Sequence, residues 1–366
     1  MTNPRHKKWM KWALQLAEKG RFTVSPNPMV GACVIRHGRL AGQGYHRQYG
    51  GDHAEVVALR QAGRKANGAT LYVTLEPCST WGKTPPCVST VLRAGIRHVV
   101  IGSTDPNPIH HKIGIAALKR EGVRVTSGVL MQEVKKQNEA FFKYTQKKLP
   151  FVTLKMAQSL DGKIATSQGR SRWITSEPAR HFVHRLRAGH DAVMVGKNTL
   201  LTDDPFLSPR LGLRDMSPEK PWRIVLAPRL EIPKNARIFK GEQLTLVAVS
   251  EKKQEALKKQ NKLRSVTLLS IGEKEGRLDM RDLLAQLANL GVATLLVEGG
   301  GELAWSLIEA NLVDRLLWIV APKIIGGRSA KTSVEGKGIN DLSKAYFVRD
   351  VNVSRLGEDW LFEGRL

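Results

Sequence analysis

Four residues in the first half of the chain could together perform metal chemistry: His53, Glu55, Cys78 and Cys87. One histidine and two cysteines supply three ligands to zinc and leave the fourth tetrahedral position for water. Zinc lowers the pKa of bound water to about 7, and a carboxylate that does not bind the metal must then move the protons. These residue types predict a zinc-dependent hydrolytic site in which Glu55 is the proton shuttle.

The order of these residues narrows the chemistry. H-x-E, then P-C, then C is typical of zinc deaminases acting on nucleobases. The alternative for each residue alone is a satisfied interior histidine or a buried thiol, as we expect for Cys33 in the strand-like run 30–35. Deaminases that act on bases in nucleic acid follow P-C-x-x-C. Here eight residues separate Cys78 from Cys87, which predicts a different substrate.

Composition sets the class of protein. A chain of 366 residues is long enough for two domains, and 42% hydrophobic with 25% charged residues is an ordinary globular balance. Three cysteines, no long apolar run and no apolar N-terminal stretch predict a reduced, cytoplasmic protein without membrane association. The net charge of +25 favours anionic partners, although a solvated basic surface would explain it equally well.

The elements that must position the four residues alternate between strand and helix. Helical spacing begins at Trp9, His53 opens a helical run, Cys78 follows a strand and Cys87 begins a helix. We therefore expect an α/β layer with parallel pairing. The elements expected here are a helix from Trp9 to Leu16, strands 30–35, 71–75 and 99–101, and a helix over 88–94.

The alternation restarts after Lys147-Lys148-Leu149-Pro150, where we place the domain boundary. It predicts a second, larger α/β domain around a mostly parallel sheet. The Lys-rich segment 251–262 is expected to be a solvated helix. The other expected elements are strands 151–156, 192–195, 223–226, 244–249, 294–297 and 316–320, and helices 177–186, 283–290 and 303–310.

A strand that runs into three glycines and then a helix, Val297 to Leu303, could hold a phosphate. Glycines let phosphate oxygens approach backbone N–H groups at a helix N-terminus. Such turns are common, and this one lacks the Rossmann spacing G-x-G-x-x-G. Alone it is a weak indication.

Several motifs, in collinear order over most of the chain, resemble one family, the bifunctional deaminase/reductases of riboflavin biosynthesis. The motifs are Pro26-Asn27-Pro28-Met29-Val30-Gly31, Gly44-Tyr45-His46, His53-Ala54-Glu55-Val56, Glu76 to Cys87, Asp105-Pro106-Asn107-Pro108 and Leu154 to Ala165. The resemblance implies a cytidine-deaminase-like α/β/α domain over 1–146. It implies a dihydrofolate-reductase-like α/β domain over 150–366.

The resemblance also implies two consecutive reactions. The first domain would remove an amino group from 2,5-diamino-6-(5-phosphoribosylamino)pyrimidin-4-one with one Zn²⁺. The second would reduce the ribose of the product to ribityl with NADPH. A small phosphorylated pyrimidine is then the expected partner, together with further copies of the chain in a dimer or tetramer, and nucleic acid is not expected.

The resemblance also assigns roles to individual residues of this chain that match functional positions of the family. The resemblance implies His53, Cys78 and Cys87 as zinc ligands, Glu55 as proton donor, and Asn27, His46 and Lys83 as substrate contacts. In the second domain it implies substrate contacts at Lys155, Ser171, Arg187, Leu207, Arg210 and Glu298. It implies NADPH contacts at Ala157, Trp173, Thr199, Asp203, Gly299, Gly300, Gly301, Glu302, Leu303, Ala304, Trp305 and Ser306.

Three departures from the family concern substrate affinity, loop shape and, for the third, a cofactor contact of the reductase half. The family commonly has His at Thr80, a different turn at 109–114, and an acidic then a small polar residue at Ala227-Pro228. Two other functions stay open: a deaminase whose reductase half is a degenerate scaffold, and a basic protein that deaminates a base within RNA. Glu55→Gln is expected to keep zinc and lose ammonia release.

Overall fold

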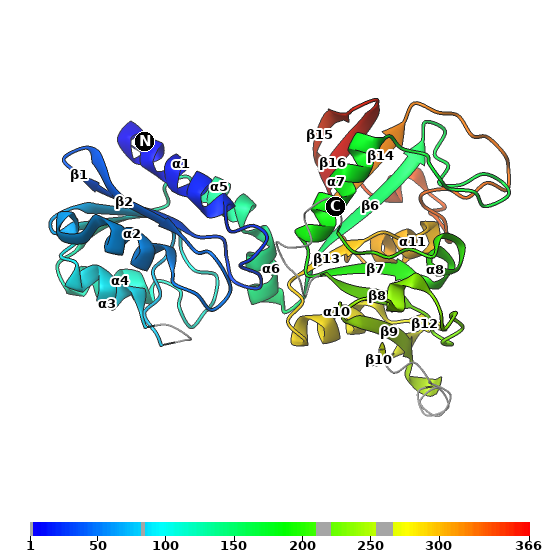
Figure 1. Ribbon diagram of the computed structural model, residues 1–366, viewed down its shortest axis with the longest axis horizontal. Coiled ribbons are helices and arrows are strands. Elements are labelled where there is room, and N and C mark those ends of the chain that lie inside the picture. Colours follow the sequence, from blue (N-terminus) through cyan, green and yellow to red (C-terminus); the bar gives the residue numbers. More distant parts are fainter. Residues whose placement is uncertain (1–2, 82–84, 210–220, 254–265) are drawn as a thin grey trace. The chain divides into compact units, whose positions relative to one another are not determined.

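The computed structural model describes residues 3–81, 85–209, 221–253 and 266–366. The chain divides into two compact units, Met1–Lys148 and Leu149–Leu366, which are described separately (Figure 1). No helix of the described residues is long and apolar enough to cross a membrane.

The first unit is a five-stranded sheet with helices on both faces, in strand order β2-β1-β3-β4-β5. The pairs β3–β4 and β4–β5 are parallel, as predicted, whereas β1 pairs antiparallel with both β2 and β3. Its elements are α1 (Pro4–Glu18), β1 (Gly31–Arg36), β2 (Arg39–Tyr45), α2 (Ala54–Ala62), β3 (Thr70–Leu75), α3 (Cys87–Arg93), β4 (His98–Ser103), α4 (Ile113–Arg120), β5 (Arg124–Ser127), α5 (Met131–Gln137) and α6 (Glu139–Lys147).

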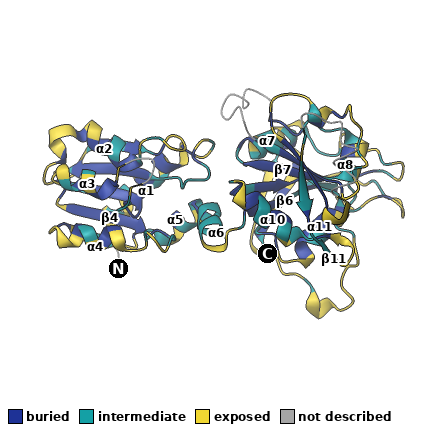
Figure 2. Ribbon diagram, turned by 90° about the horizontal axis from the view of Figure 1, so that it is seen from below, coloured by how far each residue is buried: buried dark blue, intermediate teal, exposed yellow. Residues whose placement is uncertain are grey.

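Alternation along these strands gives the first unit a core on each face of its sheet. Helices α2, α3 and α4 pack on one face, over residues such as Val34, Leu71 and Val99. Helix α1 packs on the other face through Met10 and Ala13, where Cys33 is buried as expected. Figure 2 shows the strands buried between partly exposed helices.

The second unit is built on a nine-stranded sheet in the order β10-β9-β8-β7-β13-β6-β14-β16-β15. The seven strands from β10 to β14 are parallel, which confirms the predicted mostly parallel sheet, and β16 and β15 add antiparallel pairs. Its elements are β6 (Phe151–Ser159), α7 (Glu177–Ala188), β7 (Ala192–Gly196), α8 (Lys197–Asp203), β8 (Trp222–Leu226), β9 (Thr245–Ser250), β10 (Val266–Ile271), β11 (Glu273–Lys274), β12 (Arg277–Leu278), α10 (Met280–Asn289), β13 (Thr294–Val297), α11 (Gly301–Glu309), β14 (Arg315–Ala321), β15 (Arg349–Leu356) and β16 (Asp359–Arg365).

Helices cover both faces of this sheet as well. α10 and α11 pack through Leu283, Leu287 and Leu307 on one face. α7 and α8 pack on the other, through residues such as Leu186 and Leu200. Of the predicted Lys-rich helix, only a 3₁₀ turn over Glu251–Lys253 lies within the described residues.

Candidate active sites

The predicted metal ligands of the first unit lie at the ends of three elements. His53 is the N-cap of α2, Cys78 follows β3 by three residues, and Cys87 is the first residue of α3. Helix N-termini carry partial positive charge, which would stabilise the Cys87 thiolate once a metal has displaced its proton. The fold thus brings together three residues separated by up to 34 positions.

The distances among the three side chains fit a metal. His53 Nδ1 lies 3.0 Å from Cys87 Sγ and 3.6 Å from Cys78 Sγ, and all three donor atoms lie within 4.8 Å of one another. Zinc bond lengths of about 2.0–2.3 Å place tetrahedral ligand atoms roughly 3.4–3.8 Å apart. The 3.6 Å separation falls within this range and the 3.0 Å separation is shorter, so the three donor atoms are grouped closely enough to bind one zinc ion after a small adjustment.

The charges of this cluster also fit a cation. A hydrogen bond from Cys87 lowers the pKa of Cys78 to about 4, and its bond to Cys78 and burial raise the pKa of the Cys87 thiol. The hydrogen bond with Cys78 raises the pKa of His53 to about 9. These shifts favour one thiolate and one thiol, and a bound divalent cation would favour two thiolates.

Glu55 lies in the first turn of α2 and is only 3% exposed. Burial raises the pKa of its carboxyl, partly offset by the charge of His53. Its side chain also hydrogen-bonds with that of Cys87, so it adjoins the metal-type cluster without belonging to it. A buried carboxyl that holds a proton more readily than usual is suited to general acid–base work.

Asn27 and His46 lie together beside the cluster. The His46 ring is edge-on to that of His53, with centroids 5.5 Å apart. His46 Nδ1 lies 3.0 Å from the carbonyl oxygen of Asp52, which can only accept, and burial lowers the pKa of His46. The neutral ring therefore carries its proton on Nδ1, and Nε2 accepts from Asn27 Nδ2 at 3.1 Å. This leaves the Asn27 amide oxygen available to a ligand.

Two of the departures from the family contact each other. Thr80 Oγ1 lies 3.2 Å from Nδ1 of His110, which belongs to the divergent segment 109–114. The segment is anchored by Glu76, a residue that sequence reasoning assigned no role. The buried Glu76 carboxylate accepts hydrogen bonds from the backbone N–H groups of Asp105, Lys112 and Ile115. The expected substrate contact Lys83 lies outside the described residues.

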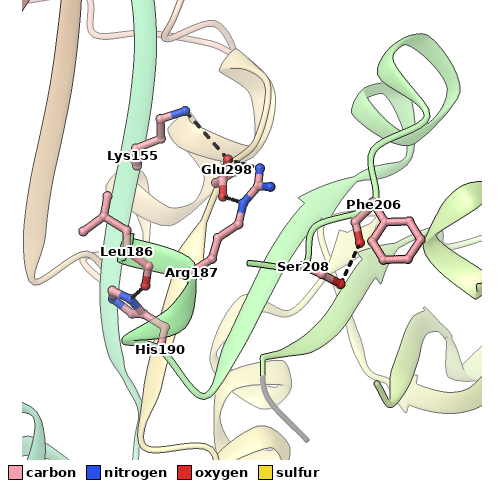
Figure 3. Close-up of polar contacts among 7 residues, drawn as sticks. All are labelled: Lys155, Leu186, Arg187, His190, Phe206, Ser208 and Glu298. Carbon is pink, nitrogen blue, oxygen red and sulfur yellow. Dashed lines mark hydrogen bonds and ion pairs between the residues drawn. The ribbon is translucent and has the colours of Figure 1, made fainter. Parts of the chain in front are cut away.

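In the second unit, three expected substrate contacts form one buried ion-pair network (Figure 3). Arg187 of α7 grips Glu298 with two hydrogen bonds, of 2.6 and 2.9 Å, and Lys155 of β6 lies 3.7 Å from the same carboxylate. Burial opposes ionisation of Glu298, yet the charges of Arg187 and Lys155 hold its pKa at about 2. Burial lowers the pKa of Lys155.

His190 supports this network, and its position just after a predicted helix did not indicate this role. As Figure 3 shows, the ring lies at the end of α7 beside Leu186. His190 Nδ1 lies 2.7 Å from the carbonyl oxygen of Leu186, and Nε2 lies 3.1 Å from Thr153 Oγ1. Burial lowers the pKa of His190, so the neutral ring donates from Nδ1. It ties the helix bearing Arg187 to the strand bearing Lys155.

The other contacts expected in the second unit lie at several places rather than in one network. Ser171 Oγ donates to Asp203 Oδ1 at 2.7 Å, and Trp173 is 65% exposed beneath the guanidinium of Arg180. Leu207 is buried in the core, so it could contact a ligand only through its backbone. Arg210 lies outside the described residues.

The glycine run forms the N-terminus of α11. A Cβ on Gly301 would lie 2.7 Å from the carbonyl oxygen of Thr332, whereas a Cβ on Gly300 would make only an ordinary contact with Thr199 Oγ1 at 3.9 Å. Ala157 lies on β6, next to β14. The side chains of Leu303, Ala304 and Trp305 are buried, and Ser306 Oγ donates to the carbonyl of Glu302. Leu303, Ala304 and Trp305 could therefore contact a cofactor only through their backbone.

Comparison with known proteins covers both units. Residues 3–103 match the cytidine and deoxycytidylate deaminase zinc-binding region, and residues 150–362 match the RibD C-terminal domain. Riboflavin biosynthesis protein RibD of Aquifex aeolicus is 40% identical over 353 residues, 96% of each chain. That of Escherichia coli is 37% identical over 360 residues, again 96% of each.

Solved structures agree with these relatives. RibD of Acinetobacter baumannii superposes with a TM-score of 0.89 at 32% identity, over 99% of this chain and 98% of that one. A diaminohydroxyphosphoribosylaminopyrimidine deaminase/5-amino-6-(5-phosphoribosylamino)uracil reductase of Thermotoga maritima gives 0.85 at 34% identity, with the same coverage. The match spans the reductase half, where the Glu298 network is intact, and so does not favour a degenerate scaffold. The chain belongs to the RibD family of bifunctional deaminase/reductases of riboflavin biosynthesis.

Proposed function

We propose that this chain deaminates 2,5-diamino-6-(5-phosphoribosylamino)pyrimidin-4-one and then reduces the ribose of the product to ribityl. The convergence of His53, Cys78 and Cys87 around one point, with Glu55 buried beside them, carries the proposal for residues 1–146. The Lys155–Glu298–Arg187 network carries it for residues 150–366.

In the deaminase half, His53 Nδ1 and the sulfurs of Cys78 and Cys87 would hold zinc. When bound, zinc supplies an activated water at neutral pH. Glu55 would carry one proton of that water to the ring nitrogen and the second to the amine, which leaves as ammonia when the carbonyl forms; its raised pKa favours holding each proton in transit. The amide oxygen of Asn27, oriented by His46, would hold the pyrimidine.

In the reductase half, the chain's own charges would position the phosphorylated sugar. Lys155, close to Glu298 but at a longer distance than Arg187, keeps donors for a substrate hydroxyl. The first turn of α11 and Thr199 would hold NADPH phosphates, since helix N-termini favour anions. NADPH supplies the hydride, and the protein orients the two reactants.

We further propose that the second unit self-associates as a dimer or tetramer. Strand β15 is the edge of its sheet, and apolar side chains are exposed on β15 and β16, among them Val351, Val353 and Phe362. An exposed apolar strand at the edge of a sheet is usually covered by another element or another chain. Sedimentation of the chain with Val353→Lys should give a smaller species than the unsubstituted chain.

A two-step assay tests the main proposal. Protein with zinc and NADPH, given the pyrimidine phosphate, should release one ammonia and oxidise one NADPH per substrate. Ammonia release without NADPH oxidation, also after addition of the deaminated intermediate, would leave only the deaminase. Loss of both would refute the proposal.

A further inference from the structure

The positive charge of this chain is concentrated in its first unit. Residues 1–148 contain 24 Lys and Arg against 8 Asp and Glu, whereas residues 149–366 contain 34 against 25. The first 51 residues contain 9 Lys and Arg and a single acidic residue, Glu18. Glu18 is paired with Arg21 and also accepts a hydrogen bond from Gln137. The proposed reactions, on a substrate with one phosphate, do not require this concentration.

These cations lie on a surface built by α1 and the neighbouring edge strand β2. Helix α1 buries Met10, Ala13 and Leu16, so its other side faces solvent. Trp12 Nε1 donates to Gln43 Oε1 at 2.9 Å, and the Arg5 guanidinium lies against Gly38 in the β1–β2 turn. We call the resulting row the cation–aromatic stripe and define it by Arg5, Lys8, Trp12, Lys19, Tyr45 and Arg47.

Cations of the stripe lie beside aromatic rings. Lys8 Nζ lies 5.1 Å from the ring centroid of Trp9, which is partly buried next to the stripe. Lys19 and Arg47 lie 6.0 and 5.7 Å from the ring of Tyr45. Trp12 is 41% exposed while its hydrogen bond to Gln43 fixes the indole. A fixed, exposed aromatic ring between cations offers both a stacking surface and phosphate partners.

We propose that the cation–aromatic stripe binds single-stranded RNA. Single-stranded nucleic acids are held by grooves or faces that combine cations for the backbone with aromatic rings for the bases. Helix α1 alone extends about 22 Å, longer than a mononucleotide needs. An anionic membrane fits less well, because the apolar side of α1 is already buried in the unit's core. The proposal concerns binding and assigns no reaction on RNA.

Fluorescence anisotropy of the zinc-loaded full chain with a labelled 12-nucleotide oligouridylate tests this. Four cations in the stripe should give a slope of log K against log salt near −3, at about −0.7 per phosphate contact. Lys8→Gln with Lys19→Gln should reduce that slope by about 1.4. Trp12→Ala should weaken binding at least about fivefold, and Trp12→Phe, which keeps a ring, should weaken it less.

The matched control is Lys119→Gln with Arg120→Gln, an equal charge change on α4, which packs on the opposite face of the sheet. If this control weakens binding as much as the stripe variants, diffuse charge is responsible and the proposal fails. It also fails if Trp12→Ala binds RNA normally while folded by circular dichroism. Binding to phosphatidylglycerol vesicles but not to oligouridylate would overturn it as well.

Discussion

The metal-type cluster of the first unit and the Glu298 network of the second bury ionisable groups in opposite ways. Around Glu298, two cations surround one carboxylate, and the network holds its charges without any added group. Around His53, two sulfurs and the buried carboxyl of Glu55 compete for protons with the imidazole, so the charges of this cluster depend on where its protons lie. The first site is completed by a metal ion, whereas the second is completed by side chains of the protein itself.

This difference predicts how each site fails. A site that needs zinc should lose activity and stability together when the metal is removed, since metal binding adds to folding free energy. A site that balances its own charge should be insensitive to metal but sensitive to the loss of one partner. Removing the metal from the first site, or one charged partner from the second, distinguishes these two behaviours.

Zinc removal should give the largest effect. Treatment with 1,10-phenanthroline should abolish ammonia release, because no activated water remains, and leave NADPH-dependent reduction of supplied intermediate intact. With free zinc about 1,000-fold above its dissociation constant, the metal stabilises the unit that binds it by about 4 kcal/mol. Calorimetry should therefore show one unfolding transition shifted and one unchanged. A parallel fall of both activities would contradict the contrast.

Glu55→Gln should lower the rate of ammonia release by about 10²- to 10⁴-fold, because the amide cannot carry the proton. Zinc stoichiometry, measured by mass spectrometry, should stay the same because Glu55 is not a ligand in the cluster. Glu121→Gln, at an exposed site on the same unit, is the control. Normal ammonia release by Glu55→Gln would show that another group moves the proton.

The sequence was sufficient to predict the residues whose chemistry is specific. The pattern around His53, Glu55, Cys78 and Cys87 allows few interpretations, and the structure brings the three ligands together. Parallel strands were also predictable, because buried strands read as continuous apolar runs. The helix over 303–310 and the strand over 316–320 correspond to α11 and β14.

Elements without such a pattern were missed. Strand β2 contains Gly42 and Gly44, which lower strand propensity, yet they are required because a Cβ at either would meet the backbone of α2 within about 2.7 Å. Strand β15 was missed because it is exposed along nearly its whole length, and β16 was missed although buried and exposed residues alternate in its first half. Contacts between distant residues, such as that of Thr80 with His110, leave no local signal.

Glu298→Gln should destabilise the second unit by about 3–5 kcal/mol, because Arg187 and Lys155 would remain buried without their partner. Reduction of supplied intermediate should be lost, and ammonia release should continue. The matched control is Glu231→Gln, which breaks the exposed pair with Lys197 and should change stability little. Equal effects of the two substitutions on stability would show that burial of the network does not increase the cost of losing one partner.

Acidification should weaken the same ion-pair network around Glu298. The pKa of Glu298 is held at about 2, below its ordinary 4.5, so its stabilising contribution is complete above about pH 4.5 and is lost as the pH falls towards 2. The second unit's melting temperature should fall less steeply between pH 5 and 3 in Glu298→Gln than in the unsubstituted chain. Identical slopes would assign the acid sensitivity to other carboxylates.

His190→Phe should give the smallest effect, because it alters the support of the network and leaves its charges in place. Loss of the bonds to Leu186 and Thr153 should cost about 1–3 kcal/mol. Because α7 would then be less firmly tied to β6, Arg187 and Lys155 would be less well positioned, and kcat/KM for reduction should fall on the order of tenfold. His181→Phe, on the exposed side of the same helix, is the matched control. If the two variants reduce the intermediate equally well, the second site does not depend on His190. The ion pairs alone would then hold Arg187 and Lys155 in position.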